Sequence, residues 1–523
     1  MRINSLNLYN PNNSTEEELV DSFVVRVKEF QKIFKDIKNS DMKYPEQHYI
    51  IEAEKGYGKT TLLKRLYFEI KRDTELNERL IPVILPEEQY NIRKLFKLWE
   101  VTSQQLEMES DEFIGLYNEM VKYSKEEDYE DICFRILEKK LKQKNVKLIL
   151  LIDNTFDILK KFKIHEQQKL REILLTSAEI RIIGASSEAL EFTFDYNKPF
   201  YDFFKRIKLK GLNFDETVDF FEKLGEISSK ENINEVLKSN SGKIEALRRL
   251  TGGAPRIMLL LFNAFIENIG AAFKSLEILI DRITPLYKHT MDSLSPVQQE
   301  IVDVIALSWD AITTKEIADK IRMQSKEVSA HLNQLEKSGI INKMPVNKKN
   351  YMYHIKERLF NIWYLMRFGG EKEKQKVQWL VNFIENWCSR GEIPVKKIDK
   401  VDINAIFRSA ENLLWKDQIE ESLEKAHIFL QLSNNTDEYN KHINKYFILL
   451  MAKKQNNSLF KLFSDSEFKL KDKFKPTYYA LMYFMKNQNE QFEIEYSKVG
   501  EELEETVEEI ISEVKRDGGF NIH

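Results

Sequence analysis

The sequence predicts an α/β domain with a parallel sheet in the N-terminal part of the chain, followed by regions that are mainly helical. Up to about residue 210, short and nearly continuous apolar runs alternate with helical patterns. Such runs are typical of parallel strands whose two faces are both covered by helices. Beyond Leu212 the apolar spacing is mainly helical, and the whole chain has only 17 glycines and 11 prolines among 523 residues. This composition also favours helices.

The predicted strands share an apolar character that is almost uninterrupted. They are Tyr49–Ile51, Leu80–Leu85, Val146–Ile152 and Arg181–Gly184. A helix is expected before the first strand, because Phe30, Ile33, Phe34 and Ile37 recur at helical spacing. A further helical region is expected over residues 95–144.

Length and composition limit the class of protein. A chain of this length predicts three or four domains of roughly 100–200 residues each. The net charge of −4 gives no general attraction to nucleic acid or anionic lipid, so any DNA contact needs a local basic patch. Cys133 and Cys388 stand alone, which fits a reducing compartment and argues against structural zinc. We expect a cytoplasmic protein, because the sequence has no apolar run of about 18–20 residues and no apolar secretory segment at its start.

The segment between the first strand and the next helix carries the strongest motif. Residues 53–60 are Ala-Glu-Lys-Gly-Tyr-Gly-Lys-Thr, the spacing of a phosphate-binding P-loop. Gly56 and Gly58 allow backbone N–H groups to turn inward around phosphates. Lys59 can reach the β and γ phosphates, and the Thr60 hydroxyl can bind Mg²⁺. The following helix directs the positive end of its dipole at the same anion.

The P-loop predicts ATP and Mg²⁺ as cofactors. Ala53 stands where the motif has its first glycine, a position that requires a tight turn more than a phosphate contact. The nucleotide-binding residues expected in the loop and at the start of the helix are Gly56, Tyr57, Gly58, Lys59, Thr60 and Thr61.

A second anchor follows the strand that ends at Ile152. A P-loop enzyme needs a carboxylate at the tip of a neighbouring parallel strand to hold Mg²⁺, and Asp153 stands there. We therefore expect Thr60 and Asp153 to be the metal ligands. The next residue in hydrolytic members is often a glutamate that orients the attacking water, but here it is Asn154. Asparagine cannot act as a base, although it can orient water, so we expect slow hydrolysis. Asp153 and Asp157 are carboxylates that could contribute, with a solvent-facing position as the alternative for Asp157.

Two later segments complete the pattern. Ala185-Ser186-Ser187 ends the strand at 181–184, where a small polar side chain can monitor the γ-phosphate; an ordinary turn is the alternative. Residues 250–256 are Leu-Thr-Gly-Gly-Ala-Pro-Arg, a turn that leads into a helix with Arg256 in its first turn. Arg256 could reach a γ-phosphate, or it could be a surface residue.

These four segments, in this order, resemble AAA+ and STAND-type ATPases, and the resemblance covers about residues 20–290. It includes an N-terminal box at Phe23–Phe30, in which Arg26 matches the family arginine and Val25 replaces a glycine. The family packs this box near adenine. The resemblance continues into a winged helix, as in origin-recognition-type initiators and their archaeal ATPase relatives.

The resemblance implies roles for several residues. Ser186 or Ser187 would be sensor 1, and Arg256, after Pro255, would be sensor 2. It also implies a homo-oligomer in which an arginine from a neighbouring subunit completes each site. Arg206 lies where such an arginine finger often occurs, although Lys205, Lys208 or a merely solvated basic face are alternatives.

Residues 291–368 predict the winged helix. Ser295 with the following proline, and Thr313 or Thr314, begin two helices well; Ser325 is expected to cap a third. A two-stranded wing is expected over residues 343–353, with Lys348 and Lys349 at its tip. Such a module can read DNA, but it can equally pack on the ATPase core as a switch element.

The expected architecture is an α/β P-loop NTPase core with a helical lid, a winged-helix domain and an all-α C-terminal arm. The expected boundaries are 1–210, 211–290, 291–368 and 369–523. The arm shows no catalytic motif and is expected to bind a protein partner or to support the winged helix. The favoured function is an ATP-dependent switch that controls assembly or partner binding. An ATP-controlled DNA-binding regulator or initiator, and a sensor ATPase of antiviral defence with a separate effector, are the alternatives.

Overall fold

The computed structural model divides the chain into two compact units. Unit 1 comprises Met1–Glu231 and Ala254–Leu259, and unit 2 comprises Asn232–Gly253 and Leu260–His523. The residues that the structure describes are 15–21, 23–86, 91–186, 198–228, 233–267, 272–345, 351–389, 403–433, 439–465 and 468–518. The four domain ranges expected from the sequence remain predictions.

Unit 1 contains a five-stranded parallel sheet in the order β2-β3-β4-β1-β5. The strands are β1 (Tyr49–Glu52), β2 (Leu80–Leu85), β3 (Lys147–Ile152), β4 (Ile180–Ser186) and β5 (Lys205–Lys208). The four strands predicted from apolar runs are confirmed. The sequence analysis missed β5, because this edge strand buries only Ile207 and is otherwise basic.

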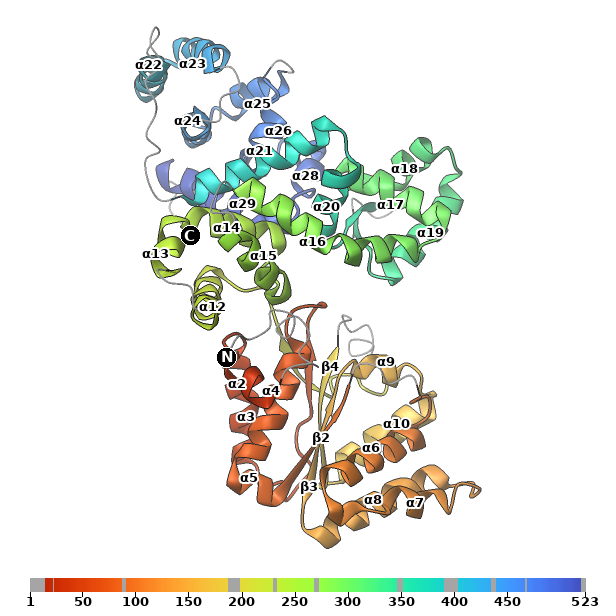
Figure 1. Cartoon of the computed structure of the whole chain (residues 1–523). Helices are drawn as coiled ribbons and strands as arrows, with labels where there is room; N and C mark the ends of the chain where they lie inside the picture. The colour runs from red at the N-terminus through yellow and green to blue at the C-terminus, as the bar shows by residue number, and fades with distance from the viewer. Residues whose placement is uncertain are drawn as a thin grey trace. The chain divides into compact units, whose positions relative to one another are not determined.

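Helices cover both faces of this sheet (Figure 1). One face carries α2 (Glu16–Asp21), α3 (Val27–Asn39), α4 (Lys59–Arg72) and α5 (Thr74–Arg79). The other face carries α6 (Leu95–Glu109), α7 (Leu116–Val121), α8 (Tyr129–Lys144), α9 (Thr155–Leu159) and α10 (Ile164–Thr176). A short 3-10 turn, η2 (Asp111–Phe113), follows α6, and α12 (Phe214–Ile227) follows the sheet. The helical region predicted at 95–144 is confirmed.

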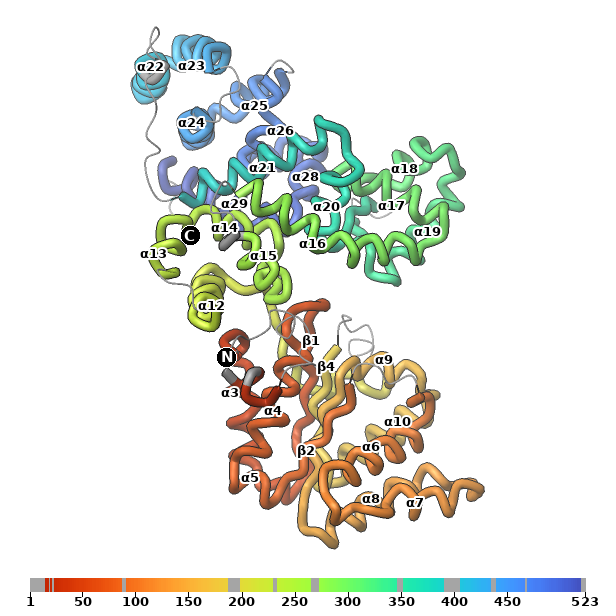
Figure 2. Tube along the Cα trace, in the orientation of Figure 1, coloured from red at the N-terminus to blue at the C-terminus, as the bar shows by residue number. Residues whose placement is uncertain are grey.

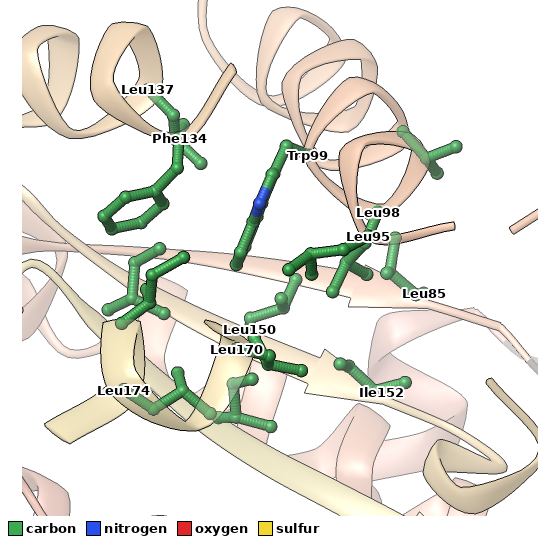
Figure 3. Close-up of a cluster of buried hydrophobic side chains, with 14 of the residues drawn as sticks. Leu85, Leu95, Leu98, Trp99, Phe134, Leu137, Leu150, Ile152, Leu170 and Leu174 are labelled. Carbon is green, nitrogen blue, oxygen red and sulfur yellow. The ribbon is translucent and has the colours of Figure 1, made fainter. Parts of the chain in front are cut away.

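The sheet buries alternate residues in two separate cores. Leu150 and Ile152 of β3 pack with Trp99 of α6 and Leu170 of α10 (Figure 3), whereas Leu151 packs on the α4 face. This alternation follows from the two-residue period of a strand. The same alternation determines which face of the sheet a residue at the end of a strand occupies.

Unit 2 consists of helices (Figure 2) and one small sheet, whose strand order is β6-β8-β7. Its helices are α13 (Ile233–Ser239), α14 (Ser241–Thr251), α15 (Pro255–Glu267, which begins in unit 1), α16 (Ala272–Asp292), α17 (Pro296–Ser308), α18 (Thr314–Ile321), α19 (Ser325–Lys337), α20 (Arg358–Phe368), α21 (Glu371–Cys388), α22 (Ile403–Trp415), α23 (Ile419–Ser433), α24 (Asn440–Ala452), α25 (Asn456–Ser464), α26 (Leu470–Lys473), α27 (Lys475–Met485), α28 (Glu490–Tyr496) and α29 (Glu501–Asp517). The strands are β6 (Ile312–Thr313), β7 (Ile341–Pro345) and β8 (Tyr351–Ile355).

The helix starts expected around 295–325 are confirmed in two of three cases. Ser295 and Thr313 each accept a hydrogen bond from the third helical residue in a capping box. The expectation for Ser325 was wrong, because Gln324 is the N-cap and Ser325 is already helical. β7 and β8 pair antiparallel in the region expected to form a wing; the wing lysines 348 and 349 lie outside the described residues.

A cluster of polar side chains links the C-terminal helices α27 and α29 to Asp310 and Arg358. Asp310 receives hydrogen bonds from Lys475 at 2.6 Å and from the Tyr479 hydroxyl at 2.8 Å. Arg358 of α20 lies 2.8 Å from Glu502 of α29. Removing one partner of a buried ion pair is strongly destabilising. The helices of the expected arm and the residues of the expected winged helix are therefore packed parts of one unit. No helix among the described residues is both long enough and apolar enough to cross a membrane.

Candidate functional site

The P-loop lies between the end of β1 and the first residue of α4. Gly56 and Gly58 have φ values of 86° and 91°, a left-handed conformation that L-residues with side chains rarely adopt. A Cβ atom added to Gly56 would lie 3.2 Å from the Cβ of Arg256. The two glycines thus satisfy a backbone requirement, and the first of them also allows Arg256 to approach the loop.

The Lys59 ammonium group is held inside the loop. It donates hydrogen bonds to the carbonyl oxygens of Ala53 at 2.7 Å and Glu54 at 2.9 Å, and Lys59 is only 7% exposed. These bonds place a positive charge at the start of α4, where the helix dipole also favours an anion. Ala53, at the position of the first glycine of the motif, thus contributes a backbone carbonyl oxygen that holds Lys59.

Thr60 and Asp153 meet directly, although the sequence separates them widely. The Thr60 hydroxyl donates to the Asp153 carboxylate at 2.5 Å, and Asp153 is 3% exposed. The Asn154 backbone N–H also donates to this carboxylate, at 3.0 Å. Hydroxyl and carboxylate oxygens are the ligands that Mg²⁺ takes beside nucleotide phosphates. The donor set therefore fits the ion that the motif implies.

Asn154 has a left-handed backbone, with φ 50° and ψ 45°, immediately before α9. Asparagine adopts this conformation more readily than most residues. Asp157 is exposed in α9. The residue beside Asp153 is thus an amide held in a tight turn, and the nearby carboxylate of α9 faces solvent.

Ser186 is the last residue of β4 and is buried. Its carbonyl oxygen accepts a hydrogen bond from the Ala53 N–H at 3.2 Å. Ser186 therefore lies at the P-loop edge of the sheet, as a residue that monitors a phosphate must. Ser187 lies outside the described residues.

Arg26 contacts the P-loop from the N-terminal box. Its Nε donates to the Tyr57 carbonyl oxygen at 3.2 Å, and its guanidinium also donates to the Lys210 carbonyl oxygen. Arg26 itself takes a left-handed conformation, with φ 69°, at the start of α3. Burial lowers the pKa of Arg26 from its usual value. The box and the loop are thus joined through Tyr57.

Arg256 lies beside the P-loop within unit 1. Its backbone N–H donates to the Gly56 carbonyl oxygen at 3.2 Å. Pro255 is the first residue of α15, and Gly252 and Gly253 before it have φ values of 66° and 64°. The Gly-Gly-Ala-Pro-Arg segment is therefore the turn that the sequence predicted, and it brings Arg256 to the loop.

Arg206 of β5 pairs with Glu52 of its own chain. Its Nε and Nη2 donate to the two Glu52 carboxylate oxygens at 2.5 and 2.8 Å. Glu52 directly precedes the P-loop, and the sequence analysis did not select it. The available signal was a charged residue at the end of an otherwise apolar strand.

A cleft elsewhere in unit 1 lies between α6, the segment before α8 and the start of α10. It holds about 400 Å³ and is lined mainly by charged side chains, among them Glu100, Glu130 and Glu166. No group of acidic, histidine or cysteine residues in the described part of the chain is arranged to hold a metal ion. We therefore assign no ligand to this cleft.

Comparisons with known proteins found no matching family model and no matching curated protein. The chain is similar to the solved structure of a Walker-type ATPase of Pyrococcus abyssi, at 17% identity over 65% of this chain and 95% of that one, with a TM-score of 0.44. It is also similar to the Aeropyrum pernix ORC1 protein in complex with DNA, at 12% identity over 67% and 95% of the two chains, with a TM-score of 0.42. The Aeropyrum pernix ORC2 protein matches at 13% identity over 69% and 94%, with a TM-score of 0.38. These findings agree with the resemblance predicted from the sequence. At these TM-scores the similarities support no conclusion about function. Any functional conclusion must rest on the geometry of the site in this chain.

Proposed function

We propose that this protein is an ATP-binding, slowly hydrolysing molecular switch of the AAA+/STAND type. The observation that carries the proposal is the 2.5 Å contact between the Thr60 hydroxyl and the buried Asp153 carboxylate. This contact joins a helix that begins with a P-loop lysine to the residue after β3, a parallel strand that β4 separates from β1; the expectation that this strand would lie next to β1 was therefore wrong. The arrangement combines a cationic phosphate cradle with a pair of oxygen ligands for Mg²⁺.

Each residue of the site has a defined task in this proposal. Lys59 and the backbone N–H groups of residues 56–61 bind the nucleotide phosphates, and Thr60 and Asp153 hold Mg²⁺. The bound Mg²⁺–ATP supplies a transferable γ-phosphoryl group and a cation that neutralises its charge. Arg26, fixed against Tyr57, lies on the adenine side of the loop, while Ser186 and Arg256 respond to the γ-phosphate. Hydrolysis is slow because Asn154 cannot accept a proton.

The connection from the site to unit 2 supports a role in switching. The two glycines at 252–253 separate the residues that contact the P-loop from α14. Within unit 2, Arg249 of α14 donates to both carboxylate oxygens of Glu509 in α29, at 2.8 and 2.9 Å. Arg248 donates to Glu505 of the same helix at 2.5 Å. A movement of Arg256 on ATP binding would therefore reach the C-terminal helices through α14 and favour assembly or partner binding.

Loss of the P-loop lysine tests this function. We expect the full-length Lys59→Ala protein to lose ATP binding, measured by equilibrium titration with fluorescent ATP and Mg²⁺. Lys71→Ala is the matched control, because Lys71 lies on the same helix α4 but pairs with Glu109 at the surface. If the Lys59→Ala and wild-type proteins bind ATP with equal affinity, the proposed function is refuted.

DNA binding through α19 is a second candidate function. The exposed side chains at this helix and its start include Arg322, Lys326 and Lys337, with Glu327 among them. Each lysine that contacts a phosphate contributes about one unit to the salt dependence of DNA binding. Duplex DNA titrated at several salt concentrations should therefore show a smaller salt slope for Lys326→Ala and Lys337→Ala than for wild type. Salt-independent binding, or no binding, would exclude this candidate.

Partner binding by residues 369–523 is best tested by surface substitutions. Deleting this segment would remove Lys475 and Tyr479, which bind Asp310, and Glu502, which pairs with Arg358. A truncated protein would then fail for structural reasons. Charged substitutions of exposed apolar residues, such as Trp415 and Ile428, avoid this problem because these side chains are 54% and 42% exposed. Unchanged recovery of partners from the native host by both variants would argue against binding at this surface.

A further inference from the structure

Glu52 is a buried carboxylate at the edge of the candidate site, and the proposed function leaves it without a task. It is the last residue of β1, it is 7% exposed, and Ala53 begins the P-loop directly after it. Burying a carboxylate costs free energy unless the charge is paired, and Arg206 provides that pairing. A buried charge kept beside the P-loop therefore points to a task in the site.

The strand register places Glu52 beside Ser186. Glu52 is the direct partner of Ser186 on β4 and of Lys208 on β5. Paired residues on neighbouring parallel strands lie about 4.8 Å apart and face the same side of the sheet. Glu52 and Ser186 therefore stand at the same level, at the edge of the sheet where the P-loop begins.

The strand period places Glu52 on the face of the sheet opposite α4. Ile50 belongs to the apolar core of that face, and Glu52 comes two residues after it within β1. Asn154 lies two residues beyond the end of β3, at the same carboxyl edge of the sheet. The chain thus has an amide where hydrolytic members often have a carboxylate, and a carboxylate two strands away in the sheet order.

The other carboxylates near the P-loop have different surroundings. Asp153 is engaged with Thr60 as part of the expected metal site. Asp157 and Glu54 are exposed to solvent. Among these described residues, Glu52 combines burial, a fixed orientation and a position next to Ser186.

We propose that Glu52 orients the water that attacks ATP, and that Arg206 of the same chain positions Glu52. This inference rests on the proposed ATPase function. In the reaction, the water oxygen bonds to the γ-phosphorus while the bond from that phosphorus to the bridging oxygen of ADP breaks. One water proton stays on the released phosphate, and the other passes through the Glu52 carboxylate to solvent. ADP leaves with the electron pair of the broken bond.

The guanidinium group of Arg206 has the geometry of a positioning residue. Two parallel N–H···O bonds to one carboxylate fix both its position and its plane. A lysine ammonium group is a compact charge without this planar fork, so it does not fix the plane of the carboxylate in the same way. Because this pair forms within one chain, Arg206 acts in cis here, in contrast to the arginine finger implied by the family resemblance.

Substitution of Glu52 in the full-length protein tests the catalytic role. We expect Glu52→Gln to lower the rate of phosphate release by about 100-fold, the usual contribution of a positioned acid–base group, with the Kd for fluorescent ATP nearly unchanged. Glu179→Gln is the matched control and should change neither quantity, because Glu179 is also 7% exposed but pairs with Lys147 at 2.8 Å, at the opposite end of the sheet. A Glu52→Gln protein with wild-type turnover, or a wild-type protein that binds ATP and never releases phosphate, would overturn the proposal.

Two further variants separate a catalytic role from a structural one. Asn154→Asp in the Glu52→Gln background should restore part of the lost turnover, because it returns a carboxylate to the same edge. Arg206→Lys should lower turnover but not ATP affinity. If Glu52→Gln and Arg206→Lys lose affinity and turnover in parallel, the pair only supports the fold and the proposal is wrong. Absence of ATP binding by the wild-type protein would instead refute the function on which it rests.

Mixing two inactive proteins distinguishes action in cis from action in trans. The Lys59→Ala protein retains Arg206 but should not bind ATP, and Arg206→Ala should bind ATP without turning it over. If Arg206 positions Glu52 in its own chain, the mixture stays inactive. Recovered phosphate release in the mixture would show that Arg206 acts on a neighbouring subunit, and would overturn its assignment here.

Discussion

The Thr60 hydroxyl donates a 2.5 Å hydrogen bond to the Asp153 carboxylate, across 93 positions of the sequence. The bond links the first turn of α4 to the residue that directly follows β3. Asp153 also accepts from the Asn154 backbone N–H, so the buried charge has two donors. Hydrogen bonds within the protein thus hold the two proposed metal ligands, Thr60 and Asp153, in contact.

Removal of the Thr60 hydroxyl should affect both stability and metal-dependent binding. Thr60→Ala leaves the buried Asp153 carboxylate short of a donor, which should lower the free energy of unfolding by about 1–3 kcal/mol. The same variant should lose most of the gain in ATP affinity that Mg²⁺ provides. Urea unfolding and ATP titrations with and without Mg²⁺ measure the two effects. Thr60→Ser, which keeps the hydroxyl, should resemble wild type; a Thr60→Ala protein with full Mg²⁺ dependence would contradict the assignment.

Arg256→Ala should separate nucleotide binding from its consequence. The contact with Gly56 uses the Arg256 backbone N–H, so alanine preserves it and ATP binding should remain largely intact. The side chain, however, could no longer make a charge-assisted bond to the γ-phosphate. Hydrogen exchange of α14 and α29, compared between ATP and ADP, should show a difference in wild type that is lost in the variant. Equal ATP-induced changes in both proteins would exclude Arg256 from the switch.

Gly253→Ala should weaken the same coupling through the backbone. Gly253 has φ 64°, where an alanine costs about 1–2 kcal/mol. The control is Gly115→Ala, because Gly115 has φ 89° and its added Cβ would meet no atom within 4 Å. Both variants should lose similar stability in urea, but only Gly253→Ala should reduce the ATP-dependent exchange difference in α14. Equal coupling in the two variants would argue against a role for this turn.

Hydrolysis by the isolated wild-type protein should be slow. Asn154 replaces the usual water-orienting carboxylate, and the Glu52 carboxylate that is proposed to take over this task lies two strands away in the sheet order. We expect turnover well below the median enzyme value of roughly 10 s⁻¹. Phosphate release at saturating ATP measures it directly. Turnover at or above that value would require another base, and Asp157 would be the first to substitute.

His48 should make the stability of unit 1 depend on pH. Its Nδ1 accepts a hydrogen bond from the Ile182 N–H at 2.9 Å, and burial lowers its pKa to about 4. In the unfolded chain the His48 imidazole binds a proton near pH 6.5, whereas in the folded state it stays neutral at that pH. Stability is therefore fully present above pH 6.5 and falls, by up to about 3 kcal/mol, as the pH decreases towards 4.

Hydrogen exchange of the Ile182 amide measures this effect, because that N–H is the partner of the imidazole. Its protection should decrease between pH 6.5 and pH 4 beyond the normal pH dependence of exchange. His48→Gln cannot titrate and should not show the additional decrease. The same decrease in both proteins would assign the effect to other groups.

Much of unit 1 was predictable because its determinants are local. Four strands were found from their apolar runs, since each is buried on both faces. The P-loop was recognised from residues 53–60, because their glycines, lysine and threonine have the order and spacing that phosphate binding requires. Asp153 was selected because a carboxylate at the end of an apolar strand, downstream of a P-loop, is where a metal ligand is expected; its contact with Thr60 is observed, and its role as a ligand stays a prediction.

Other features could not be obtained from local sequence, for identifiable physical reasons. The sequence did not predict β5, because this edge strand buries only one of its residues. The helix start at 324–325 was misplaced by one residue, because a serine can cap a helix or begin it. The role of Arg206 depends on strand order, which places β5 next to β1 and so brings Arg206 to Glu52.

The sequence by itself therefore determined the kind of site, and the tertiary structure decided which residues share it. A P-loop needs particular residues within one short segment, so its chemistry is visible in eight consecutive positions. The pairs Thr60–Asp153, Arg206–Glu52 and Arg249–Glu509 join residues that lie 93, 154 and 260 positions apart. No spacing rule links such residues, because their meeting depends on strand order in the sheet and on the packing of helices that are distant in the chain.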